Sequence, residues 1–179
     1  PELASKTVHV SHGMLRLPEG KMSSRTGDVI TALSLLADIK SKVLEKMGDE
    51  RIAKNEKEET AMKVAVGALK YSILKQSIGK DIIFDFEKSI SFEGDSGPYI
   101  QYAYVRTQAI LRKAKENKIT ELENIGKIKD VKVSDVERMI QKFPEIVEMA
   151  SEKHVLNYIC SYLVELCRAF NSYYEENRI

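Results

Sequence analysis

From residue 31 onward, apolar residues recur mainly every three or four positions, and this spacing restricts the fold more than any other feature of the chain. Such spacing places side chains on one side of a helix. In TALSLLADIKSKVLEKM (31–47) the apolar stripe consists of Leu36, Ile39, Val43 and Met47. ETAMKVAVGALKYSILKQ (59–76) is apolar on nearly all sides, which is typical of a buried central helix. The pattern predicts an all-α helical bundle.

The stretch EGDSGP marks the start of a further helix. Ser96 or Gly97 can cap this helix, and Pro98 suits its first turn because proline has no N–H to leave unpaired there. The helix YIQYAYVRTQAILRKAKE should end near Asn117. The polar residues 118–133 predict a loop.

Three more helical segments are predicted beyond that loop. SDVE (134–137) has the Ser-x-x-Glu pattern of a capping box, and Pro144 is expected to end the helix and start another. The final segment, KHVLNYICSYLVELCRAFNSYYEEN, again has helical spacing. Its apolar stripe consists of Leu156, Ile159, Leu163, Leu166 and Phe170.

The first thirty residues lack the helical period. VHVSH (8–12) and MLRL (14–17) are predicted strands, whereas PEG and TGD are predicted turns. The segment 82–92 is too short and irregular to assign. A short piece of different structure is therefore expected to precede the helical bundle.

Composition restricts the class of protein. The chain has 179 residues, 43% of them hydrophobic, which is enough for one or two domains with a core. It holds no apolar run near the roughly 18 residues of a membrane span, so a membrane partner is not expected. Cys160 and Cys167 lie roughly 10 Å apart along one predicted helix and cannot pair, which favours a reduced, cytoplasmic protein.

Several kinds of site are not indicated by the residues. His9 and His12 lie three apart without any Cys-x-x-Cys pair, so we expect no metal site. Neither a glycine-rich phosphate motif nor a Ser–His–Asp set is recognised. The net charge of +1 means that nucleic-acid binding would need a local basic patch.

One candidate site is KMSSRTGD (21–28), which follows Gly20 and contains Gly27, and is expected to form a mobile loop. A lysine among hydroxyl groups on such a loop can fold over a polyphosphate and neutralise charge as a nucleotidyl group departs. The alternative is an ordinary surface turn.

A second candidate site lies on the helix that follows EGDSGP. Tyr99, Tyr102 and Arg106 stand at i, i+3 and i+7, so they share one helix face. Aromatic rings beside an arginine suit unstacked RNA bases, and lysines suit phosphates. The basic residues that follow are Arg112, Lys113, Lys115 and Lys118. The alternative is that the tyrosines are core residues with paired hydroxyls.

Taken together, these stretches resemble one known family. HVSHGMLRLPEGKMSSRTGDVI resembles the end of the catalytic domain of arginyl-tRNA synthetases, which are class I aminoacyl-tRNA synthetases, and KMSSR is similar to their KMSKS loop. SFEGDSGPYIQYAYVR (91–106) resembles the start of their helical anticodon-binding domain, and SYLVELCRAFNSYY fits the later bundle. The resemblance implies that residues 1–50 end a catalytic domain and connect it to the bundle. Residues 51–179 would be a C-terminally truncated anticodon-binding domain.

The resemblance also implies roles for the loop. The family activates arginine with ATP and Mg²⁺ and attaches the amino acid to tRNA(Arg). Lys21 would contact the ATP phosphates and stabilise the transition state, while Ser23 and Ser24 would steady the loop. Met22 would pack as a hinge, and Arg25 would supply a compensating cation.

For the helical part, the resemblance implies tRNA contacts. Tyr99, Tyr102 and Arg106 match positions that meet the anticodon loop, and Tyr162 is a further candidate. Thr26 stands where the family commonly has a lysine after SSR, so the resemblance assigns no contact of that lysine to this chain.

The HIGH signature, the arginine-binding residues and the tRNA-elbow domain of the family are not found in this sequence. The resemblance therefore implies a C-terminal piece that is inactive alone, carries no bound cofactor and has no DNA partner. Two alternatives stay open, namely a stand-alone helical RNA- or protein-interaction module and another class I synthetase with the same type of bundle. The stretch SFEGDSGPYIQYAYVR disfavours the latter.

Overall fold

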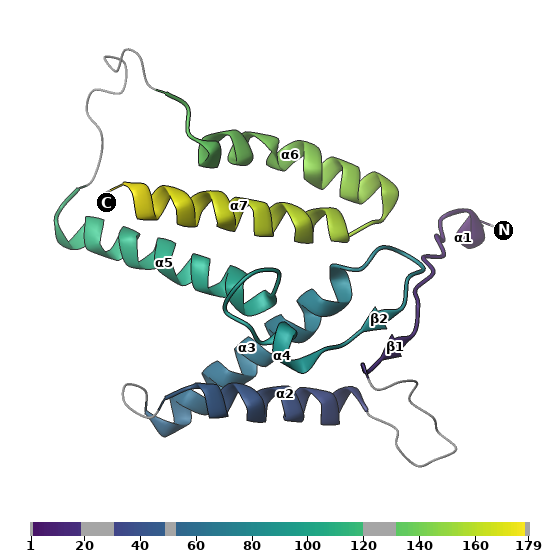
Figure 1. Ribbon diagram of the computed structural model, residues 1–179. Helices are drawn as coiled ribbons and strands as arrows, with labels where there is room; N and C mark the ends of the chain where they lie inside the picture. Colours follow the sequence, from purple (N-terminus) through teal and green to yellow (C-terminus); the bar gives the residue numbers. More distant parts are fainter. Residues whose placement is uncertain (1, 19–30, 49–52, 120–131, 178–179) are drawn as a thin grey trace.

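The fold is a helical bundle with a small strand pair at one end (Figure 1). The computed structural model describes residues 2–18, 31–48, 53–119 and 132–177. In chain order the elements are α1 (Glu2–Ser5), β1 (Leu15–Arg16), α2 (Ala32–Lys46), α3 (Lys54–Leu74), β2 (Ile82–Ile83), α4 (Phe86–Ser89), α5 (Gly97–Glu116), α6 (Asp135–Lys153) and α7 (Asn157–Glu176).

Helix α2 confirms the prediction for 31–47. Its N-cap is Thr31, whose hydroxyl accepts the N–H of Ser34 at 3.0 Å. Leu35, Ile39 and Val43 are its buried residues and pack with α3 in one core cluster. The buried stripe therefore begins one residue before the predicted Leu36, which is only half-buried.

Helix α3 packs against α2, α4, α5 and α7, so it is the central helix. The prediction of a buried central helix is therefore correct for its position and only partly correct for its burial. The buried positions of α3 are Ala61, Ala65, Ala68, Tyr71 and Ser72, and the rest are half-buried or exposed where the structure describes them. The helix also begins at Lys54, five residues before the predicted start. Lysine and glutamate are good helix formers, which explains why this charged segment extends the helix.

Helices α3 and α5 cross at two glycines. A Cβ atom on Gly97 would lie 2.5 Å from the carbonyl oxygen of Gly67 and 2.9 Å from the amide nitrogen of Ala68. No side chain fits into this contact, and the neighbouring Ser96 and Pro98 are fully buried. The first turn of α5 therefore lies directly on the backbone of α3.

The N-terminal piece contacts the bundle through the strand pair. Strand β1 runs parallel to β2, with Leu15 opposite Ile82, and this confirms MLRL as a strand. The unassigned segment 82–92 forms β2 and α4. The strand predicted for VHVSH (8–12) is wrong: these residues are exposed, without a strand beside them in the described part of the chain.

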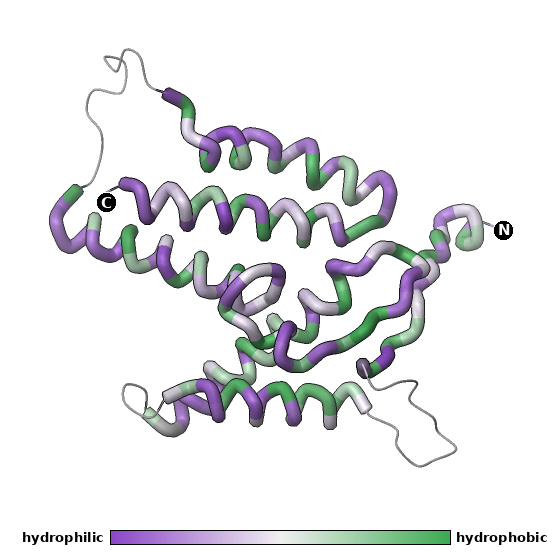
Figure 2. Tube along the Cα trace, viewed as in Figure 1, coloured by the Kyte–Doolittle hydropathy of each residue, from purple (hydrophilic) through white to green (hydrophobic). Residues whose placement is uncertain are grey.

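Helix α7 lies between α5 and α6, so it buries two sides (Figure 1). Cys160 and Val164 pack with Tyr71 of α3, whereas Tyr162 contacts α6. The predicted stripe is therefore only partly correct, because none of its five residues is fully buried. Leu156 is 51% exposed, and the other four are half-buried, namely Ile159, Leu163, Leu166 and Phe170. Figure 2 shows apolar and polar residues alternating along both α6 and α7.

Helix α6 begins with the predicted capping box between Ser134 and Glu137. The prediction that Pro144 ends this helix is wrong, since α6 continues to Lys153. A proline removes one backbone hydrogen bond and crowds the preceding turn. The helix nevertheless packs along α7, where the Tyr162 hydroxyl donates to the Met139 carbonyl oxygen at 2.9 Å, one residue before the Ile140 carbonyl that Pro144 leaves without its usual backbone donor.

Within the described ranges, the helices are all too short or too polar to cross a membrane.

The glycine crossing can be tested by adding a methyl group. We expect Gly97→Ala to lower the free energy of unfolding by about 1–3 kcal/mol, the usual cost of overpacking. The matched control is Gly48→Ala, because nothing lies within 4 Å of a Cβ at Gly48. Urea unfolding of both variants measures the effect, and equal stability of the two would contradict the crossing.

The packing of α7 can be tested through its two thiols. Cys160 and Cys167 are free and buried, and burial raises the pKa of Cys167 to about 11. At pH 8 roughly one such thiol in a thousand is ionised, against about a quarter at an ordinary pKa of 8.5. We expect iodoacetamide to label both cysteines only after urea unfolding, as measured by mass spectrometry. Rapid labelling of the folded chain would contradict this packing of α7.

Candidate nucleic-acid interface

The candidate interface depends on how the start of α5 is held. The Ser96 hydroxyl accepts the N–H of Tyr99 at 3.1 Å and caps the helix. Asp95 ties the preceding turn to α3, because its carboxylate accepts the Tyr71 hydroxyl. The Lys75 ammonium group also donates to the Asp95 carbonyl oxygen at 3.0 Å. The register of α5 is therefore fixed by polar contacts as well as by the glycine crossing.

The Tyr71 hydroxyl stays protonated in this arrangement. Burial, and then the hydrogen bond to Asp95, raise the pKa of Tyr71 well above its ordinary value. A protonated phenol donates, and the carboxylate of Asp95 accepts. The contact therefore persists over the physiological pH range.

The structure brings together Tyr99, Tyr102 and Arg106 as the sequence predicts, and it adds two residues of α7. The Arg106 guanidinium carbon lies 4.7 Å from the ring centre of Tyr102 and 4.9 Å from that of Tyr174. Both distances are in the range of a cation–π contact. We call these three residues, with Tyr99 and Asn171, the α5–α7 cluster.

Asn171 links the cluster by two hydrogen bonds. Its side-chain oxygen accepts from Arg106 Nη1 at 3.1 Å, and its side-chain nitrogen donates to the Tyr99 hydroxyl at 3.0 Å. One side chain of α7 therefore holds two side chains of α5.

The two interpretations of the tyrosines, as surfaces for RNA bases and as core residues, apply to different tyrosines. Tyr102 is 42% exposed and Tyr174 is 37% exposed, so both offer ring surface to a partner. Tyr99 is half-buried with its hydroxyl paired, which is closer to the core alternative. The cluster is thus partly structural and partly open.

Asn171 and Tyr174 were not singled out from the sequence. Both lie in NSYY (171–174), and their spacing of three places them on one side of α7. That spacing is the only local sign that the two residues act together. Their contact with α5 joins residues that are 65 or more positions apart in the sequence, so it depends on how the helices pack.

Tyr162 does not belong to this face. Its side chain is only 4% exposed, and its hydroxyl donates to Met139 of α6. Burial raises the pKa of Tyr162, which keeps the hydroxyl a donor. A buried ring cannot stack on a base, so its predicted tRNA contact does not fit this arrangement.

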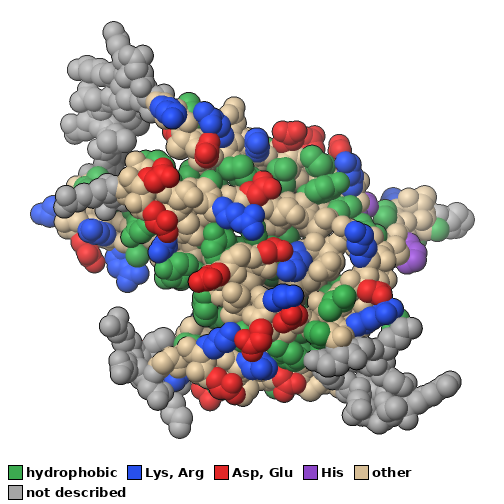
Figure 3. Space-filling view, viewed as in Figure 1, with side chains coloured by type: hydrophobic (Ala, Val, Ile, Leu, Met, Phe, Trp, Pro, Cys, Tyr) green, Lys and Arg blue, Asp and Glu red, His purple; other side chains and the backbone are tan. Residues whose placement is uncertain are grey.

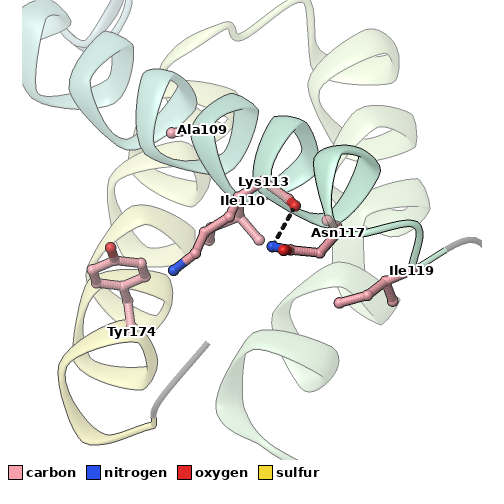
Figure 4. A pocket seen from close by; sticks show the side chains of 7 residues that line it. Ala109, Ile110, Lys113, Asn117, Ile119 and Tyr174 are labelled. Atoms are coloured by element: carbon pink, nitrogen blue, oxygen red, sulfur yellow. Dashed lines mark hydrogen bonds between the residues drawn. The ribbon is translucent and has the colours of Figure 1, made fainter.

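A hollow of about 230 Å³ adjoins the cluster at Tyr174 and continues along α5 (Figure 4). Figure 4 shows the side chain of Lys113 extending from α5 toward Tyr174. The described residues that line the hollow are Ala109, Ile110, Lys113, Ala114, Asn117, Ile119 and Tyr174. Its lining is mainly apolar, with one ammonium group at the side nearest the cluster.

Basic side chains gather near the C-terminal end of α5, whereas acidic and basic side chains are interspersed over α2 (Figure 3). Arg112, Lys113, Lys115 and Lys118 are all exposed there. A local basic patch therefore exists despite the net charge of +1.

The other candidate site cannot be compared with the structure. KMSSRTGD (21–28), with Lys21, Ser23 and Ser24, lies outside the described residues. His9 and His12 are exposed. Among the residues that the structure describes, no group of three or more His, Cys, Asp or Glu side chains could hold a metal ion.

Two family models match the chain in order. The model "tRNA synthetases class I (R), catalytic domain" matches residues 1–86, and the model "DALR anticodon binding domain" matches residues 100–179. The second range contains all but the first residue of the cluster.

Curated relatives match nearly all of this chain. The arginine–tRNA ligase of Halothermothrix orenii is 37% identical over 182 residues, which cover 99% of this chain and 31% of the relative. That of Borrelia hermsii is 37% identical over 173 residues, covering 96% of this chain and 30% of the relative.

Solved structures agree with these matches. The arginyl-tRNA synthetase of Thermus thermophilus superposes with a TM-score of 0.75 at 28% identity, over 99% of this chain and 29% of that one. The Plasmodium falciparum enzyme shares the fold with a TM-score of 0.71 at 20% identity, over 98% of this chain and 31% of that one. Domain models, relatives and fold together show that this chain belongs to the arginyl-tRNA synthetase family, and it spans 30–31% of the length of these curated relatives.

Proposed function

We propose that this chain supplies the anticodon-binding face and the KMSKS-like loop of an enzyme that attaches arginine to tRNA(Arg). The observation that carries the proposal is the partly open α5–α7 cluster, of which all residues but Tyr99 lie in the range matched by the anticodon-binding model. The names of the relatives support arginine and its tRNA as the substrates.

The chemistry of the cluster suits single-stranded RNA. Exposed rings of Tyr102 and Tyr174 provide surfaces on which unstacked bases can stack, and Arg106 keeps a positive charge between them. Lys113 and Lys115 lie farther along α5, where ammonium groups can neutralise backbone phosphates. RNA would therefore lie along α5, with bases toward the cluster.

The catalytic role is proposed for residues outside the described ranges. Lys21 would neutralise the ATP phosphates during arginine activation, and Ser23 and Ser24 would steady the loop, with Met22 packed at its hinge and Arg25 as a second cation. ATP, accompanied by Mg²⁺, and arginine are substrates of the enzyme. Their remaining contacts require residues that this chain does not contain, so we expect no catalysis by the chain alone.

The division of the chain into residues 1–50 and 51–179 is also a proposal. The catalytic-domain model extends to residue 86, whereas α3 packs against α5 of the anticodon-binding range. We further propose a cytoplasmic location, which suits two buried thiols that are not paired.

The RNA face can be tested with two tyrosines of the same helix. We expect Tyr102→Ala to weaken binding of a tRNA(Arg) transcript by about 5- to 150-fold, because stacking contributes about 1–3 kcal/mol per base. The matched control is Tyr104→Ala, since Tyr104 is 63% exposed but makes no ring contact with the cluster among the described residues. Filter binding and thermal unfolding measure affinity and stability on the same samples. Equal affinities for the two variants would contradict the proposed face.

The loop can be tested in an enzyme that contains this chain together with the rest of its catalytic domain. We expect Lys21→Ala to slow arginine-dependent ATP–pyrophosphate exchange by about 10²–10³, by analogy with loss of one oxyanion donor. Binding of tRNA should change little, because the loop and the anticodon face are separate sites. Normal exchange by this variant would remove Lys21 from its proposed role.

A further inference from the structure

The hydrogen bonds of Asn171 determine which way its amide group faces. Arg106 has N–H donors and no acceptor, so the atom of Asn171 that faces it must be the oxygen. The NH₂ group of Asn171 therefore faces the Tyr99 hydroxyl, 3.0 Å away. No other assignment satisfies both contacts.

This orientation fixes the role of the Tyr99 hydroxyl. Since the NH₂ group of Asn171 can only donate, the oxygen of Tyr99 accepts, and its own proton must point elsewhere. Within the described part of the chain, the structure offers that proton no acceptor. Tyr99 is half-buried at the edge of the open cluster, so this donor is left for a partner.

The same side chain restrains Arg106. Two tyrosine rings enclose the guanidinium group at 4.7 and 4.9 Å, and the bond to Asn171 stops it from turning in its own plane. The N–H groups that Asn171 does not use are therefore held in constant directions.

We infer that Asn171 is a positioning residue for RNA binding, which holds Arg106 and makes the Tyr99 hydroxyl a donor toward acceptor atoms of an unstacked nucleotide. The inference rests on the proposed function. Asn171 acts through its two partners and need not touch RNA. In the alternative role, Asn171 only joins α5 to α7, and replacing it would change the stability of the fold but not the RNA affinity of the folded chain.

The variant Asn171→Asp separates these two roles. The new carboxylate still accepts from Arg106, with a stronger, charge-assisted bond. Because a carboxylate cannot donate, the Tyr99 hydroxyl turns its proton inward, and the donor toward RNA is lost. We expect the thermal midpoint to stay unchanged or to rise while binding of a tRNA(Arg) transcript weakens about 2- to 12-fold, the range for one hydrogen bond.

Tyr99→Phe provides an independent test, because it removes the same proton without adding charge. We expect it to weaken binding by a similar factor. In the Tyr99→Phe background, Asn171→Asp should have a clearly smaller effect on binding than in the unaltered chain, since the shared donor is already gone. If Asn171→Asp weakens binding by the same factor in the Tyr99→Phe background as in the unaltered chain, the carboxylate acts by repelling RNA. That result would overturn the inference.

The remaining outcomes distinguish the inference from the proposed function. If Tyr102→Ala weakens binding but Asn171→Asp and Tyr99→Phe do not, the inference fails and the RNA face stands. If the unaltered chain does not bind the transcript, or if Tyr102→Ala leaves its affinity unchanged, the proposed face fails and the inference fails with it.

Discussion

The contact between Gly97 and the backbone of Gly67 determines where the rest of the bundle can lie. It brings the first turn of α5 so close to the backbone of the central helix α3 that no side chain fits between them. Asp95 reinforces the contact through Tyr71 of α3 and through Lys75, the residue that caps the C-terminal end of α3. Because α7 packs on α5 and α6 packs on α7, a shift of this first turn would displace every later helix. The candidate interface begins two residues beyond Gly97, so its geometry depends on the same contact.

Local signals in the sequence predicted the helices well, because caps act within one turn. Ser96 and Ser134 each cap the helix that the sequence assigned to them, and Thr31, the first residue of the predicted helix 31–47, caps α2. Features that depend on distant partners could not be predicted in this way. The parallel pairing of Leu15 with Ile82 joins elements far apart in sequence. The continuation of α6 through Pro144 occurs in a helix that packs along α7, and a local rule for proline takes no account of such packing.

The same distinction applies to the candidate site. Tyr99, Tyr102 and Arg106 share one helix face by spacing alone, so the sequence sufficed to group them. Asn171 and Tyr174 join them only because α7 crosses α5 there. Tyr162 shows the converse: the family resemblance offered it as a further tRNA contact, but α6 covers its side of α7. A helix that packs on two sides has little free surface, and periodicity does not reveal which part stays open.

In the proposed role, the cluster combines packing between helices with recognition of RNA, and its residues contribute to the two tasks to different degrees. Tyr99 and Asn171 join α5 to α7 through a hydrogen bond that leaves the hydroxyl proton of Tyr99 for a partner, while Tyr102 and Tyr174 leave ring surface exposed. Arg106 takes part in both, because the contacts that join the helices also hold its guanidinium in place. Ordering a long side chain on binding costs about 0.5–1.5 kcal/mol. An arginine already held by folding would avoid much of that cost, so packing between α5 and α7 would contribute to the proposed RNA affinity without a direct contact.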